Sequence, residues 1–92
     1  MKISRKDVRA IFRAVLDGQM SRDAADRWAY SVVKEQEAGT LVYVPPSDEE
    51  RIWGGVMYLY GIDLKHSSPG DFLDSDGAIK DAMQRTVGDE EV

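Results

Sequence analysis

Carboxylates are the most abundant chemically active side chains in this chain, and most of them lie in its second half. Residues 1–34 carry a balance of +4 and residues 35–92 a balance of −9, which together give the net charge of −5. General acid–base catalysis needs two carboxylates that converge on one cleft with separated pKa values. The spacing of these acids indicates no such pair, and many of them stand where helices are expected to begin. The sequence therefore predicts no catalytic residue and a protein that is not an enzyme.

His66 is the only histidine, and it lies in an expected loop. Nucleophilic catalysis with Ser67 would require a third group that orients the histidine and an oxyanion hole, which neighbours in sequence do not supply. An exposed loop histidine is the commoner case. A small enzyme that combines His66 with Asp63 or Asp71 stays open as a third hypothesis, although the sequence names no substrate for it.

The run Asp74-Ser75-Asp76-Gly77-Ala78-Ile79 matches the middle of a calcium-binding EF-hand loop. In that comparison Asp74 and Asp76 provide two ligands, but Phe72 stands where the first ligand is required and Met83 where the bidentate glutamate is required. The favoured interpretation is a helix start with acids near its dipole. Since the chain also lacks cysteine, zinc-ligand spacing, a P-loop and a dinucleotide motif, no metal ion and no cofactor are expected.

A basic stripe lies along the first expected helix and could contact phosphate groups. No aromatic residue is interleaved with it and the whole chain is acidic, so a solvated face is the favoured interpretation and nucleic acid is not the expected partner. A nucleic-acid-associated regulator, doubled in a dimer, stays the alternative function. The stripe consists of Lys2, Arg5, Lys6, Arg9 and Arg13.

Aromatic residues beside acids give the strongest indication of a binding surface. On the expected third helix, Trp53 and Tyr60 fall on the side of the core, whereas Tyr58 points away from both and is expected to be exposed. The sequence therefore predicts a docking surface for a basic protein partner, formed by Asp48, Glu49, Glu50, Tyr58, Asp63, Asp71, Asp74 and Asp76.

Four helices must position these residues. The first begins at Ser4, which forms a capping box with Asp7, and the second is capped by Ser21 and ended by Gly39. The apolar residues between these signals recur at helical spacing. The expected fold class is all-α, a compact four-helix domain with helices over residues 4–17, 21–37, 47–60 and 75–86.

The third helix carries two further signals. Ser47 and Glu50 are placed as a capping box, and the pair Gly54–Gly55 indicates a close crossing with another helix, since glycine in a helix costs about 1 kcal/mol relative to alanine. Before this helix, residues 40–46 form an extended connector that contains the β-favouring run 41–44. A lone strand has no neighbour to pair with, so this run is expected to stay unpaired or to pair in a dimer.

The whole chain, residues 1–92, is expected to form a single domain whose acidic tail, residues 88–92, is frayed. No apolar run approaches the roughly 20 residues that span a bilayer, and no signal peptide is recognised, so a cytoplasmic location without membrane contact is expected. A chain this short buries a modest core, and a homodimer stays open.

Four short segments follow one another along the chain: Leu16-Asp17-Gly18-Gln19-Met20-Ser21, Trp28-Ala29, Gly61-Ile62-Asp63-Leu64 and Phe72-Leu73. With these segments the chain resembles a group of short acidic bacterial proteins that are uncharacterised. The resemblance implies no catalytic residues. Some members are suspected of being immunity-type proteins that neutralise toxins, which implies an inhibitor that binds a basic partner through an acidic surface.

Overall fold

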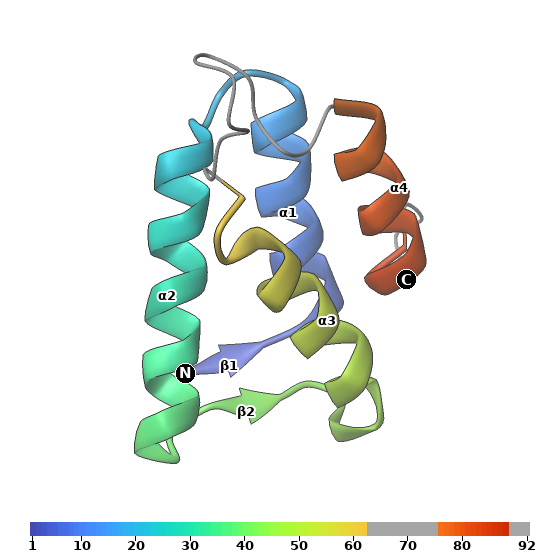
Figure 1. Cartoon of the computed structure of the whole chain (residues 1–92). Coiled ribbons are helices and arrows are strands. Elements are labelled where there is room, and N and C mark those ends of the chain that lie inside the picture. Colours follow the sequence, from blue (N-terminus) through green and yellow to red (C-terminus); the bar gives the residue numbers. More distant parts are fainter. Residues whose placement is uncertain (63–75, 89–92) are drawn as a thin grey trace.

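The computed structural model describes residues 1–62 and 76–88, which contain four α-helices and two short strands (Figure 1). The all-α prediction is confirmed, and each helix lies within two residues of its expected bounds. The elements are β1 (Lys2–Ile3), α1 (Arg5–Leu16), α2 (Arg22–Ala38), β2 (Val42–Tyr43), a 3₁₀ turn η1 (Pro46–Asp48), α3 (Glu49–Leu59) and α4 (Asp76–Thr86).

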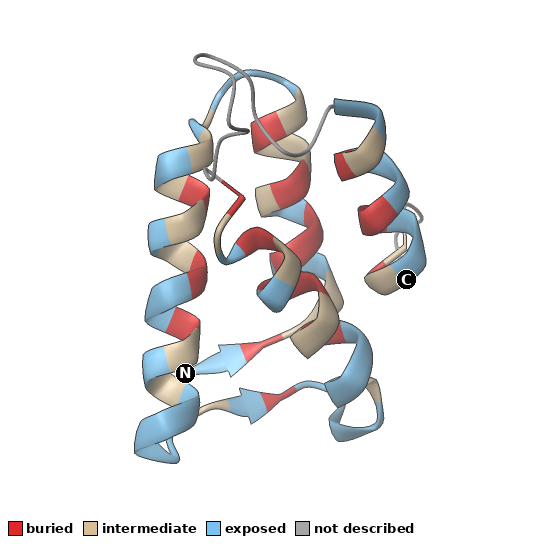
Figure 2. Ribbon diagram, in the orientation of Figure 1, coloured by how far each residue is buried: buried red, intermediate tan, exposed pale blue. Residues whose placement is uncertain are grey.

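The helices are arranged around α1 and α3, which pack on each other at the centre (Figure 1). Helix α2 packs on α3 from one side, and α4 packs on both α1 and α3 from the other. The buried positions face this shared interior, as the red segments of Figure 2 show. The largest fully buried side chains come from all four helices and include Phe12, Val32, Ile52, Leu59, Ile79 and Met83.

The predicted helix ends of α1 and α2 are confirmed. The Ser4 hydroxyl accepts a hydrogen bond from the Asp7 N–H at 3.3 Å, and the Asp7 carboxylate accepts one from the Ser4 N–H at 2.9 Å, which completes the capping box. The Ser21 hydroxyl accepts from the Ala24 N–H at 3.0 Å. At the other end of α2, Gly39 has φ 76°, a left-handed conformation that a side chain would strain.

The predicted close crossing occurs at Gly55. A Cβ atom at this position would lie 2.7 Å from Cγ1 of Val8 and 3.1 Å from Cγ1 of Val87. Its neighbour Gly54 lies at an ordinary distance, since a Cβ atom there would be 3.4 Å from Cγ2 of Thr86. Gly55 therefore allows α1 and α4 to approach α3 together, which no larger residue would permit.

The expectation that the run 41–44 has no partner within the chain is wrong. Strand β2 pairs in parallel with β1, with Lys2 opposite Val42 and Ile3 opposite Tyr43. The Val42 N–H donates to the Met1 carbonyl at 2.7 Å, and the pairing buries Ile3 and Tyr43 while Val42 stays exposed. The extended approach to the Ser4 cap makes the chain before α1 available as a strand.

The predicted capping box at Ser47 is also wrong. Residues 46–48 form a 3₁₀ turn in which the Asp48 N–H donates to the Pro45 carbonyl at 3.0 Å, and no side chain caps either this turn or α3. The peptide bond between Val44 and Pro45 is cis. The Pro45 carbonyl thus accepts the hydrogen bond of the Asp48 N–H, and no side chain is needed for it. The carboxylate of Asp48 instead pairs with Arg5 of α1.

Candidate functional site

The acids predicted for the docking surface fall into three groups. Glu49 and Glu50 are exposed in the first turn of α3. Asp48 lies 2.8 Å from Arg5 in an ion pair, with 16% of its side chain exposed, and exposed Asp76 lies 3.4 Å from Arg22. Asp63, Asp71 and Asp74 lie outside the described residues, as do His66, Phe72 and Leu73. Among the acids predicted for the docking surface that the structure describes, Glu49 and Glu50 are therefore the ones that form no ion pair with another described residue.

The expected exposure of Tyr58 is wrong. Its ring stacks on Phe12 with 5.8 Å between ring centroids, and the residue packs against the core. Tyr58 follows Gly54 and Gly55 by four and three residues, so it lies on the flank of α3 that these glycines open to α1 and α4. The close packing of α1 and α4 on α3 therefore also covers Tyr58.

The expected burial of Tyr60 is wrong as well. Helix α3 ends at Leu59, and Tyr60 is its C-cap with an extended ψ of 113°, so helical periodicity does not fix its side chain. It is 42% exposed, and its ring centroid lies 6.2 Å from that of Tyr30 on α2, which is 45% exposed. Trp53 is half-buried and packs against the edge of the core.

These residues belong to a surface that we call the aromatic stripe. Met57 follows Trp53 by four residues, which places both on one flank of α3, and Tyr60 lies directly after the last residue of the helix. Met57 is 43% exposed. Glu50 lies three residues before Trp53 and continues the flank to the start of the helix. The aromatic stripe consists of Glu49, Glu50, Trp53, Met57 and Tyr60 of the α3 segment and Tyr30 of α2.

Contacts of Asp26 and Lys34 support the α2 side of the aromatic stripe. The Gly61 N–H donates to the Asp26 carboxylate at 2.6 Å, which ties the end of α3 to α2 beside the two tyrosines. The ammonium of Lys34 lies 5.3 Å from the ring centroid of Tyr30 and 3.7 Å from the Glu37 carboxylate. The hydrogen bond and charge of Tyr30, followed by the charge of Glu37, raise the pKa of Lys34 above its usual value.

The basic stripe of α1 is divided by internal contacts. Arg5 is used in the ion pair with Asp48. Arg9 is only 3% exposed and donates from Nε to the Gly88 carbonyl at 2.9 Å and from Nη2 to the Val87 carbonyl at 3.1 Å, at the end of α4. Lys2 and Lys6 are exposed. Sequence reasoning missed this use of Arg9, because no local pattern links it to residues almost eighty positions away.

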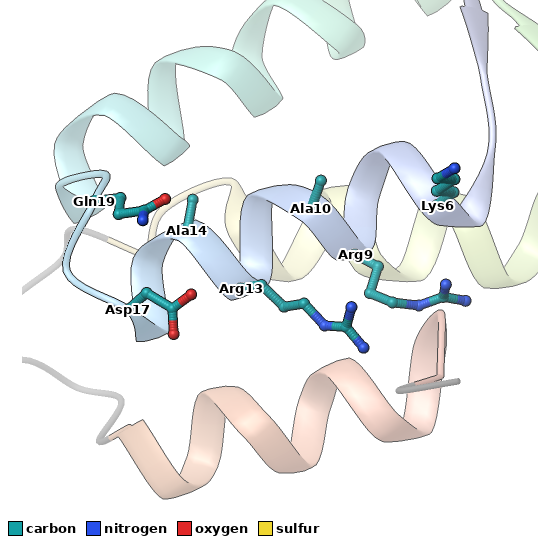
Figure 3. Close-up of a pocket in the computed structure, with 7 residues that line it drawn as sticks. All are labelled: Lys6, Arg9, Ala10, Arg13, Ala14, Asp17 and Gln19. Atoms are coloured by element: carbon teal, nitrogen blue, oxygen red, sulfur yellow. The ribbon is translucent and has the colours of Figure 1, made fainter. Parts of the chain in front are cut away.

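A hollow of about 260 Å³ opens along α1 beside Arg9, and we call it the α1 hollow (Figure 3). Arg9 and Arg13 extend toward α4, while the small side chains of Ala10 and Ala14 lie on the other side of the helix axis in this view. A second hollow of about 290 Å³ continues from Lys6 and Arg9 toward Pro45. The α1 hollow is lined by Lys6, Arg9, Ala10, Arg13, Ala14, Asp17 and Gln19.

Within residues 1–62 and 76–88, no three His, Cys, Asp or Glu side chains come together as a metal site would need. In the same ranges, each helix is too short or too polar to cross a bilayer.

Comparison with known proteins finds a bacterial relative. The uncharacterized protein YxzC of Bacillus subtilis (strain 168) is 38% identical over 58 residues, which are 61% of this chain and 40% of that protein. The chain thus spans less than half the length of this relative. Its bacterial origin agrees with the resemblance drawn from the sequence, and its name assigns it no activity.

The other comparisons add no relatives. No protein-family model matches the chain. No solved structure matches it either.

Proposed function

We propose that this protein is a non-enzymatic module that binds another protein through the aromatic stripe. The observation that carries this proposal is the exposed ring pair of Tyr30 and Tyr60 beside exposed Met57, on two helices that a hydrogen bond to Asp26 holds together. Aromatic residues and methionine are enriched where proteins bind one another, and a few aromatic anchors supply most of the binding free energy. The aromatic stripe offers such anchors on rigid elements.

The charges around the aromatic stripe favour a basic partner. Glu49 and Glu50 precede Trp53 by four and three residues, so exposed carboxylates stand at one end of the apolar surface. The net charge of −5 adds a long-range attraction for a cationic protein. Such steering raises the association rate and weakens as salt screens it, with a Debye length of about 8 Å at physiological ionic strength.

Neutralisation of a toxin is the finer form of this proposal. The resemblance to suspected immunity-type proteins supports it, and a cationic toxin has the charge that Glu49 and Glu50 favour. Under this proposal, co-expression of the protein relieves the growth defect caused by the toxin that it binds. Relief that persists after the aromatic stripe is altered would count against the surface, and binding without relief would count against neutralisation.

A matched pair of double variants tests the binding surface. Met57→Ser/Tyr60→Ser removes apolar area from the aromatic stripe, and Val42→Ser/Val44→Ser removes similarly exposed apolar area from β2 and the residue after it as the control. A partner is first identified by affinity capture and purified, and its dissociation constant is then measured by calorimetry. We expect the stripe variant to lose about 2 kcal/mol of binding free energy, roughly a 30-fold loss of affinity. The control should bind as the unaltered protein does.

Two results would contradict the proposal. Equal losses in both double variants would mean that the measured effect does not belong to the aromatic stripe. An unchanged dissociation constant between about 0.05 and 0.5 M salt would contradict the basic partner, because screening weakens attraction between exposed charges.

The alternative function, a regulator that contacts nucleic acid through α1, has less support. Arg5 and Arg9 are engaged inside the molecule, so Lys2 and Lys6 are the exposed members of the basic stripe in the described part of the chain, with Arg13 half-buried. A mobility-shift assay with DNA and RNA at low salt tests it. Binding that weakens steeply as salt rises would favour the alternative over the module.

A further inference from the structure

We propose that the α1 hollow binds a phosphate group, held by Arg9 with help from Lys6. This site is separate from the aromatic stripe and does not depend on the proposed function. Its starting point is an arginine that is 3% exposed yet lines the α1 hollow and its continuation toward Pro45. The ligand class is inorganic phosphate or the phosphate monoester of a small molecule.

The charge of Arg9 is only partly offset by its surroundings. Buried charges in proteins are ordinarily paired, but no described carboxylate lies within ion-pair distance of Arg9. Its hydrogen bonds go to two carbonyls at the end of α4, where the helix dipole supplies about half an elementary negative charge. A net positive charge is therefore left at the wall of the α1 hollow.

The guanidinium of Arg9 uses one of its two edges for hydrogen bonds within the protein. The two carbonyls occupy Nε and one hydrogen of Nη2, which form one edge of the planar group. The other edge, Nη1 and the second hydrogen of Nη2, makes no hydrogen bond to the described residues. Phosphate oxygens accept two parallel N–H bonds from such an edge, which fixes the anion in direction as well as distance. The carbonyls hold Arg9 in place before any ligand arrives.

The shape and lining of the α1 hollow suit a small anion. Its volume of about 260 Å³ lies just below the range of pockets for drug-sized ligands, so it admits a phosphate group with part of its substituent. The small side chains of Ala10 and Ala14 leave this space along the helix. Lys6 adds a second cation within one turn of Arg9, whereas Asp17 repels an anion from the opposite end. The preferred position is therefore the end near Arg9.

The acidic charge of the whole protein does not prevent this binding. At physiological ionic strength the Debye length is about 8 Å, so distant exposed carboxylates are largely screened. The groups that line the α1 hollow act at shorter range, and Arg9 and Lys6 stand at the end of the hollow away from Asp17. The local balance decides whether an anion binds.

Nuclear magnetic resonance of the full chain tests the site directly. Inorganic phosphate is titrated into ¹⁵N-labelled protein at constant ionic strength, with chloride as the balancing anion. We expect saturable shifts of the Arg9 Nε–H resonance and of backbone amides of residues 6–14, with a dissociation constant on the order of 1 mM. A phosphate-bearing mononucleotide and a short DNA strand are titrated in parallel to distinguish the source of the phosphate.

Single-charge variants provide the matched control. Lys6→Gln removes an exposed cation from the α1 hollow, and Lys34→Gln removes an exposed cation from α2, so both lower the net charge equally. We expect about a tenfold loss of phosphate affinity for Lys6→Gln and none for Lys34→Gln. Arg9→Lys keeps the charge but loses the forked edge, and it should weaken binding by more than Lys6→Gln does, in protein shown to be folded by circular dichroism.

Several outcomes would overturn the inference. These are the absence of saturable shifts up to about 20 mM phosphate, shifts that map away from α1, and equal affinity losses in Lys6→Gln and Lys34→Gln. Binding of the DNA strand at α1 without binding of inorganic phosphate or the mononucleotide would also overturn it, because the surface would then recognise a polymer rather than a single phosphate group.

Discussion

Arg9 is the residue whose environment in the structure differs most clearly from the one predicted from the sequence. In the sequence it belongs to a basic stripe with a solvated face as its favoured interpretation. In the structure it is buried and its two hydrogen bonds close the end of α4 onto α1. Local spacing correctly placed its Cα on a helix, but the burial comes from chain folding over nearly eighty residues, which no local pattern encodes.

Replacing Arg9 with methionine tests its structural role. Methionine preserves much of the apolar stem, but the Val87 and Gly88 carbonyls lose their donors. We expect Arg9→Met to lower the free energy of unfolding by about 2 kcal/mol, the cost of leaving buried acceptors unsatisfied, as measured by urea denaturation. Arg85→Met, which removes an exposed arginine of α4, should change it by less than about 0.5 kcal/mol. Equal losses of unfolding free energy in the two variants would contradict a structural role specific to Arg9.

Tyr43 gives the molecule a defined response to alkaline pH. Burial, followed by the charge of Glu49, raises the pKa of Tyr43 above its ordinary value of 10.0, and its hydroxyl donates to the Gln36 side chain at 3.2 Å. A group whose pKa is higher when folded stabilises the protein below its unfolded pKa and loses this contribution as pH rises through the folded pKa. We therefore expect the free energy of unfolding to fall above about pH 10.

The Tyr43→Phe variant isolates that contribution. Without an ionisable hydroxyl at this position, its free energy of unfolding should decline less between about pH 9 and 11 than that of the unaltered protein. Urea denaturation at a series of pH values measures both slopes. Parallel curves for the two proteins would mean that Tyr43 ionises alike in the folded and unfolded states.

At the scale of the elements, the helices were predictable and their irregular ends were not. The caps at Ser4 and Ser21 use local side-chain bonds, which a sequence displays directly. At Ser47 the same pattern is present, but a 3₁₀ turn after Pro45 satisfies the backbone first. The end of α3 at Leu59 likewise exposes Tyr60, which periodicity alone assigned to the core.

The two serines provide a direct comparison of a real cap with an apparent one. We expect Ser4→Ala to lower the free energy of unfolding by about 1 kcal/mol, because the Asp7 N–H loses its acceptor. Ser47→Ala should leave it within about 0.5 kcal/mol, because no side chain caps that turn. Thermal unfolding followed by circular dichroism measures both. A larger loss of unfolding free energy in Ser47→Ala would indicate that the Ser47 side chain does cap the helix.

The adjacent glycines of α3 should respond to alanine with opposite signs. Gly55→Ala brings a methyl group against both Val8 and Val87, so we expect an overpacking cost in the upper part of the usual range of about 1–3 kcal/mol, which exceeds the gain of about 1 kcal/mol in helix propensity. Gly54→Ala meets Thr86 at an ordinary distance, so it should keep most of that gain. Denaturation of the two single variants decides this, and stabilisation by Gly55→Ala would contradict the close crossing.

For the whole molecule, the sequence was sufficient for the fold class and insufficient for the surface. Helical periodicity and caps are local, so the four helices could be placed before their packing was known. The aromatic stripe, by contrast, depends on which flank of α3 the neighbouring helices cover. Gly55 draws α1 and α4 to one flank and covers Tyr58, which leaves Trp53 and Met57 along another flank and Tyr60 exposed at the end of the helix. Such a choice of flank follows from packing rather than from composition.

The central position of α1 and α3 also determines how the molecule opens. Because α2 packs mainly on α3 and α4 on α1 and α3, we expect either outer helix to open while the central pair remains packed (Figure 1). Amide hydrogen–deuterium exchange should therefore be slowest in α1 and α3. Phosphate at the α1 hollow should retard exchange in α4, whereas a protein on the aromatic stripe should retard it in α2. Each ligand would thus slow amide exchange in a different outer helix, so the two effects could be distinguished even when both ligands are bound.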